Sequence, residues 1–105
     1  MKKVFISQPM NGKTDEEIRE QREIALAAAE HFLNEPVEEI KSFFEDYNPK
    51  TGSVPLKYLA KSLELLADAD VAYFAPGWES ARGCKIERAC AESYGINIID
   101  MIRGD

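Results

Sequence analysis

Residues 69–87 read ADVAYFAPGWESARGCKIE, which is an apolar run, a turn and the beginning of a helix. Residues Val71–Ala75 are continuously apolar, as is typical of a strand that is covered on both faces. Pro76 and Gly77 interrupt this run, and residues 80–94 then form a predicted helix that ends at Gly95. The pattern indicates a strand of a parallel sheet, followed by a helix that packs on it.

The residues on either side continue this alternation of strands and helices. Thr14 and Glu17 form a predicted capping box at the start of a long helix, and Pro36 follows its end. The expected elements are a strand at Lys3–Ser7, a helix at Thr14–Asn34, an edge strand at Val37–Phe44, a helix at Leu56–Leu66, a strand at Val71–Ala75, a helix at Ser80–Tyr94 and a strand at Ile96–Ile99. We therefore expect residues 1–105 to form a single α/β domain, a Rossmann-like or flavodoxin-like three-layer sandwich with a parallel sheet of about four strands.

The charge and hydropathy of the chain exclude several classes of partner. It has 105 residues, with 19 acidic and 13 basic side chains and a net charge of −6. Such a chain repels a phosphodiester backbone, so we expect no duplex nucleic acid partner, although a local pocket can still bind a single nucleotide. Stretches without a charge, such as Val71–Trp78, are far shorter than the roughly 20 residues that cross a bilayer. No membrane partner is expected.

Metal ligands and targeting signals are also scarce in the sequence. Cys84 and Cys90 do not form a Cys-x-x-Cys pattern, and His31 is the only histidine. Because these residues are too few for a disulfide framework or a zinc site, we expect no metal ion and no other cofactor. The apolar run Val4–Ile6 is too short for the core of a secretory signal, which predicts a cytoplasmic location.

Ligands of such a sheet bind beyond the carboxyl ends of its strands, so the loops that follow the strands are the candidate sites. These loops are Ser7–Gly12, Glu45–Pro55, Pro76–Gly83 and the residues from Asp100 onward. The first and third lead into helix amino termini, which suit a phosphate or carboxylate, although turns require the same Gly and Pro residues. The predicted substrate-binding residues are Ser7, Gln8, Pro9, Met10, Asn11, Gly12, Gly77, Trp78, Glu79, Ser80, Arg82 and Gly83. Trp78 is equally suited to stacking on a base and to packing within its loop.

One carboxylate occupies an unexpected place on the helix that follows Gly83. At about 100° per residue, Glu87 falls in the small and apolar arc, whereas Lys85, Arg88 and Glu92 cluster on another side. A carboxylate that faces the sheet must be hydrogen-bonded, paired or neutralised. Glu87 is therefore a candidate catalytic residue, and the alternative is a core-edge glutamate that reaches water or pairs with Arg82 or Arg19.

Two strings carry a resemblance to a known family: VFISQPMNG at residues 4–12, and the stretch at residues 69–87. Together they resemble the nucleoside 2-deoxyribosyltransferase-like superfamily, in particular a small branch of uncharacterised bacterial and phage members. The likeness spans nearly the whole chain. The second string is the more specific, because its Gly, Trp, Ser and Glu residues recur at fixed spacing.

The resemblance implies a nucleoside or nucleotide as substrate and Glu87 as the nucleophile that attacks C1′ and expels the base. The covalent deoxyribosyl-enzyme would then be resolved by a second base or by water, with retention at C1′. The loop at Ser80–Gly83 would approach the sugar or a 5′-phosphate closely, which explains the need for Gly83. Members of the superfamily commonly complete the site across a dimer, so a homodimer is expected.

The chain departs from the family pattern at two positions. Phe5 stands where the characterised transferases have a tyrosine, and Ser62 stands at the best match to an aspartate. Retaining chemistry usually needs a second carboxyl group about 5 Å from the first; it could come from Glu79, Asp46, Asp100, or Asp105 of a neighbouring chain. Two alternatives to an enzyme follow: a module that binds a nucleotide without cleaving it, and a structural protein in which Glu87 is a buried ion-pair partner.

Overall fold

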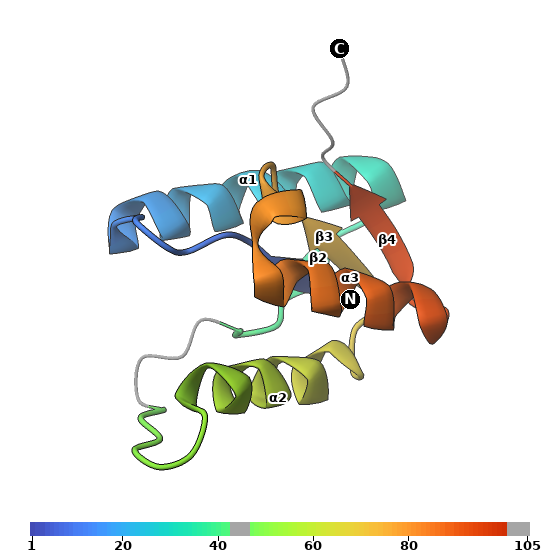
Figure 1. Cartoon of the computed structure of the whole chain (residues 1–105). Coiled ribbons are helices and arrows are strands. Elements are labelled where there is room, and N and C mark those ends of the chain that lie inside the picture. The colour runs from blue at the N-terminus through green and yellow to red at the C-terminus, as the bar shows by residue number, and fades with distance from the viewer. Residues whose placement is uncertain (43–46, 101–105) are drawn as a thin grey trace.

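The computed structural model describes residues 1–42 and 47–100 and has an α/β architecture (Figure 1). Its strands are β1 (Lys2–Ser7), β2 (Val37–Glu39), β3 (Val71–Phe74) and β4 (Asn97–Asp100), and its helices are α1 (Asp15–Leu33), α2 (Val54–Leu66) and α3 (Arg82–Ser93), with a short 3₁₀ turn η1 at Trp78–Ser80. The strands form one parallel sheet in the order β2-β1-β3-β4. The predicted Rossmann-like or flavodoxin-like sandwich is confirmed.

Alternate residues of β1 face opposite layers of the sandwich. Val4 and Ile6 pack with Ala25 and Ala29 of α1 on one face. Phe5 belongs to the cluster on the other face, which α2 and α3 cover. Figure 1 shows α1 on one side of the sheet and α2 and α3 on the other. Residues of β3 are fully buried because helices cover both faces, as their continuous apolar pattern predicts.

The capping box predicted for the first helix is present. The Thr14 side chain accepts a hydrogen bond from the Glu17 amide at 3.1 Å, and the Glu17 carboxylate accepts one from the Thr14 amide at 2.9 Å. The helix ends at Leu33, and Asn34 adopts the left-handed conformation that often terminates a helix.

The second strand is much shorter than its predicted span of Val37–Phe44. It ends at Glu39, and the amide of Ile40 makes a last backbone hydrogen bond to Val4 at 2.9 Å. Residues 43–46 lie outside the described residues, so the end of that prediction and the start of the predicted connection Glu45–Pro55 are not described. Beyond the strand, the Ser42 hydroxyl donates a hydrogen bond to the Ile6 carbonyl of β1.

The boundaries of the other elements differ from the predictions by one or two residues. The second helix begins at Val54, where the Ser53 hydroxyl accepts the Leu56 amide hydrogen bond and Pro55 fits the first turn. The third helix begins at Arg82, because η1 occupies the residues before it, and β4 is shifted by one residue. Within the described residues, no helix is both long enough and apolar enough to cross a membrane.

The strand order reverses its direction between β1 and β3. The chain runs outward from β1 to β2 and then crosses back to β3 on the opposite side of β1. In open α/β sheets, ligands bind at the carboxyl ends of the strands where such a reversal occurs. The ends of β1 and β3 are therefore the place to look for a site.

Candidate functional site

A cavity of about 780 Å³ lies at the carboxyl ends of β1 and β3. This volume is in the range of pockets for small ligands. The cavity is lined by Phe5, Ile6, Ser7, Gln8, Pro9, Met10, Asn11, Ser42, Pro55, Tyr58, Leu59, Ser62, Gly77, Ser80, Ala81, Arg82, Gly83, Cys84 and Glu87. Glu87 and Arg82 are its charged side chains among the described residues.

Most of the residues predicted to bind substrate line this cavity. They are Ser7, Gln8, Pro9, Met10, Asn11, Gly77, Ser80, Arg82 and Gly83. They come together because β1 and β3 are paired, with Ser7 opposite Phe74, so the loops that follow the two strands begin side by side. Gly12, Trp78 and Glu79 were also predicted but do not line the cavity.

Trp78 is the first residue of η1, and its side chain packs against the core cluster that contains Phe74. Its ring meets the Phe74 ring edge-on at a centroid distance of 5.9 Å, and the Arg88 guanidinium lies 5.4 Å from the Trp78 ring centroid. Of the two interpretations of Trp78, the structure therefore favours packing within its own segment over stacking on a ligand base.

Glu87 is the buried carboxylate of the cavity, and only 8% of the residue is exposed. It lies on the inward face of α3 with Cys84 and Ala91, as the helical wheel predicts. The Ser7 hydroxyl, at the end of β1, donates a hydrogen bond of 2.6 Å to its Oε1 atom. No ion pair joins Glu87 to any residue of the described ranges, so the alternative pairing with Arg82 or Arg19 is absent there.

The surroundings of Glu87 change its acidity and that of its neighbour Cys84. Burial raises the pKa of Glu87 to about 7, although hydrogen bonds with Ser7 and Ser62 favour the ionised form. Burial also raises the pKa of Cys84 to about 11; a hydrogen bond with Ser7 opposes this rise and the Glu87 charge adds to it. At neutral pH the thiol is protonated, whereas both forms of Glu87 are available.

Gln8 has a structural task in addition to its place on the cavity wall. Its side-chain oxygen accepts a hydrogen bond from Arg22 Nη1 at 2.8 Å, and its amide nitrogen donates to the Ile18 carbonyl at 3.2 Å. Arg22 is itself buried and also contacts Glu39, the Ile40 carbonyl and Ser42. This polar network lies beneath the loop that follows β1.

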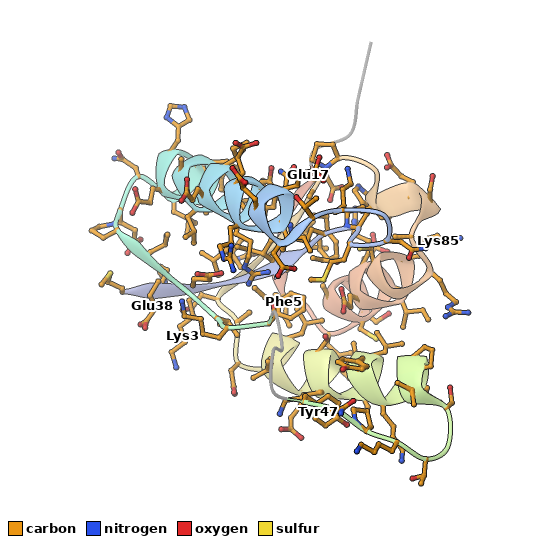
Figure 2. All side chains as sticks on the ribbon, turned by 90° about the vertical axis from the view of Figure 1, so that its left-hand side faces the viewer. Lys3, Phe5, Glu17, Glu38, Tyr47 and Lys85 are labelled. Atoms are coloured by element: carbon orange, nitrogen blue, oxygen red, sulfur yellow. The ribbon has the colours of Figure 1, made fainter. Side chains whose placement is uncertain are left out.

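The cavity wall formed by α2 was missed from the sequence. Tyr58 and Leu59 contribute to it, and the Tyr58 hydroxyl donates a hydrogen bond of 2.5 Å to the Tyr47 carbonyl. Figure 2 shows Phe5 between the sheet and α2, and Tyr47 against α2. A signal was available, because Tyr58 is four residues before Ser62 and so shares its face of the helix. Ser42 and Cys84 also line the cavity and were not predicted, whereas Pro55 and Ala81 belong to the candidate segments Glu45–Pro55 and Pro76–Gly83.

The second carboxylate expected from the resemblance has no counterpart among the described cavity residues. Glu79 does not line the cavity, and Asp100 accepts two hydrogen bonds from Arg88, at 3.1 and 2.7 Å. Asp46 and Asp105 lie outside the described residues. Residues 1–42 and 47–100 also contain no group of three or more His, Cys, Asp or Glu side chains that could hold a metal ion.

Comparison with known proteins identifies a family for the chain. A family model described as a domain of unknown function (DUF4406) matches residues 2–100, so the chain belongs to that family. No curated protein and no solved structure matches the chain significantly.

Proposed function

We propose that this protein breaks the N-glycosidic bond of a nucleoside or nucleotide, and passes the sugar to a second base or to water through an ester on Glu87. One observation carries the proposal: Glu87 is a buried carboxylate without a cation partner in the described residues, exposed to a cavity at the strand-order reversal. A buried ionisable group with a perturbed pKa in a cavity is a candidate for a functional residue. The resemblance of residues 4–12 and 69–87 to the nucleoside 2-deoxyribosyltransferase-like superfamily supports the choice of reaction.

The reaction has two balanced steps. In the first, a carboxylate oxygen of Glu87 forms a bond to C1′ while the C1′–N bond breaks, and its electron pair leaves with the base, which takes up a proton from solvent. In the second, water or another base attacks C1′, the ester bond breaks and the Glu87 carboxylate is restored. The incoming group loses a proton in this step, so the overall reaction consumes no other reagent. Double displacement retains the configuration at C1′.

The surroundings of Glu87 fit each step. The Ser7 hydroxyl donates a hydrogen bond to one carboxylate oxygen and so fixes the orientation of the nucleophile. Burial raises the pKa of Glu87 to about 7, so a carboxylate that is poorly solvated and more nucleophilic is still populated at neutral pH. Pro55, Tyr58 and Leu59 offer an apolar wall on which a base can lie.

A second candidate function is nucleotide binding without cleavage. Two cavity residues favour it: Phe5 cannot donate the hydrogen bond of a tyrosine, and Ser62 cannot supply the charge of an aspartate. Such a module would hold an intact nucleotide over Glu87 and report its presence to a partner.

A pair of assays separates the two functions. Release of free base is measured from a panel of 2′-deoxyribonucleosides and their 5′-monophosphates, with and without an acceptor base, for wild type and Glu87→Gln. We expect wild type to release base with at least one substrate, and Glu87→Gln to lose several orders of magnitude in rate while keeping its fold. Intact-mass spectrometry of acid-quenched wild type should then show the glycosyl adduct.

Two results with the same panel of substrates would contradict the enzymatic proposal. If wild type binds a nucleotide by calorimetry but releases no base, the binding module is the correct function. If wild type neither binds nor cleaves any member of the panel, both functions are wrong. Far-UV circular dichroism of the Gln variant checks that any loss of activity is not a loss of fold.

A further inference from the structure

Among residues 1–42 and 47–100, the carboxyl end of β1 has a strand partner on one side only. Lys2, Lys3 and Val4 pair with β2, but Phe5, Ile6 and Ser7 pair with β3 alone, because β2 ends at Glu39. Ser7 carries the hydroxyl that contacts Glu87. In the described part of the chain, strand pairing therefore holds the segment that places this hydroxyl from one side only.

Side chains replace the missing part of β2. The Ser42 hydroxyl donates a hydrogen bond of 3.3 Å to the Ile6 carbonyl and accepts one of 3.0 Å from Arg22 Nη2. On the other side of Ser7, the Gln8 side chain accepts a hydrogen bond of 2.8 Å from Arg22 Nη1. The Arg22 guanidinium thus binds Gln8 directly and is linked to Ile6 through the Ser42 hydroxyl, and these two residues flank Ser7.

Arg22 is suited to this task by its shape and its burial. Its side chain is 6% exposed, and its Nε donates to the Glu39 carboxylate, which balances the buried charge. Burial acts to raise the pKa of Glu39, but the hydrogen bonds and charges of Arg22 and Lys41 outweigh burial and lower it. A planar guanidinium with donors in fixed directions can bind Glu39, Gln8 and Ser42 at once, whereas a lysine ammonium cannot reproduce this fork.

We propose that Arg22 is a positioning residue, which fixes the Ser7 hydroxyl on the Glu87 carboxylate by holding the residues on both sides of Ser7. The expected effect of Arg22 on catalysis rests on the proposed function. Its expected effect on the hydrogen bond between Ser7 and Glu87 does not. Arg22 does not line the cavity. Its effect on the site passes through Gln8, Ser42 and the end of β1.

The test is a titration of the Glu87 carboxyl group by carbon-13 NMR, which needs no substrate. Ser7→Ala removes the hydrogen bond that favours the ionised form, so the Glu87 pKa should rise by about one pH unit. Arg22→Met should produce a similar rise although Ser7 is still present. Arg22→Lys should also produce it, because the charge remains but the fork is lost.

A matched control removes another paired guanidinium from the same domain. Arg88 binds Asp100 by two hydrogen bonds and is not hydrogen-bonded to Ser7, Gln8 or Ser42. Arg88→Met should therefore leave the Glu87 pKa unchanged. If Arg22→Met does not fold, Ser42→Ala takes its place, since it removes the link to the Ile6 carbonyl and leaves Arg22 paired with Glu39.

The titrations test the role of Arg22 independently of whether the protein cleaves a nucleoside. A Glu87 pKa that rises in Ser7→Ala but stays at the wild-type value in Arg22→Met or Ser42→Ala overturns the inference. It is equally overturned if Ser7→Ala leaves that pKa unchanged, because Ser7 then does not interact with Glu87. If the protein cleaves nucleosides, Arg22→Met should lower kcat by about tenfold to a hundredfold with KM changed little, and the pH at which activity appears should move upward.

Discussion

Glu87 has an environment that is unfavourable for a charge. It is buried, its described partners are hydroxyl groups, and the ion pairs of the described residues lie elsewhere. A buried carboxylate in a structural ion pair would have the opposite property, with a lowered pKa and a stabilising charge. The dependence of stability on pH therefore distinguishes a functional from a structural Glu87 without any knowledge of the substrate.

We predict that wild type loses stability as the pH rises from about 4.5 to above 7. The folded state binds the Glu87 proton more tightly than the unfolded chain, because burial raises the pKa from 4.5 to about 7. The contribution of the Glu87 proton to stability is thus fully present below pH 4.5 and lost as the pH rises through 7, and it amounts to about 3 kcal/mol at most.

Glu87→Gln cannot ionise, so it should match wild type near pH 4 and be more stable near pH 8. Urea unfolding of both proteins at the two pH values measures this difference, and a Gln variant that is less stable at pH 8 would instead indicate a stabilising charge on Glu87.

At the level of elements, the stretch from the end of β3 to the first turn of α3 contains two glycines with different requirements. Gly77 has φ of 92° and lies before η1, whereas Gly83 is in the first turn of α3. A Cβ atom on Gly77 would lie 3.4 Å from Pro9, an ordinary contact, so the obstacle there is the backbone conformation rather than space. A Cβ atom on Gly83 would meet nothing within 4 Å and would extend into the open space around the first turn.

We predict opposite effects on stability for alanine at these two positions. Gly77→Ala should cost about 1–2 kcal/mol, because the left-handed conformation is strained for an L-residue. Gly83→Ala should leave stability unchanged or raise it by up to about 1 kcal/mol, since alanine favours a helix. If a ligand approaches the first turn of α3 closely, Gly83→Ala should nevertheless weaken binding or turnover. Thermal melting and the base-release assay give the two readouts, and a stable Gly83→Ala protein with full activity would show that the added methyl meets no ligand.

For the whole molecule, the alternation of apolar strands and helices was enough to predict the sheet. The spacing of apolar residues, and the Gly and Pro residues that interrupt it, are local properties of the sequence. The length of β2 was not predictable in this way. Arg22, which lies far from β2 in sequence, is hydrogen-bonded to Glu39, Ile40 and Ser42 at the end of this strand, and these contacts exist only in the folded chain. Glu87 was predicted because a carboxylate in an apolar arc breaks a local pattern. Tyr58 and Leu59 were missed because they look like ordinary residues of an amphipathic helix.

The exposed apolar surface of the chain bears on its assembly. Several large apolar side chains are exposed on the single chain, among them Ile24 and Phe32 on α1, Leu56 on α2, and Tyr94 beside α3. A small domain with this much exposed apolar surface gains stability when a second copy covers part of it. We therefore predict a homodimer, with a sedimentation mass about twice the chain mass of 11.8 kDa at micromolar concentration. Replacing Ile24 and Phe32 together, and Leu56 separately, by glutamate would identify the face involved, because only a charge on the buried face should release the monomer. A wild type that sediments as a monomer throughout the micromolar range would contradict the prediction and would require each chain to form its site alone.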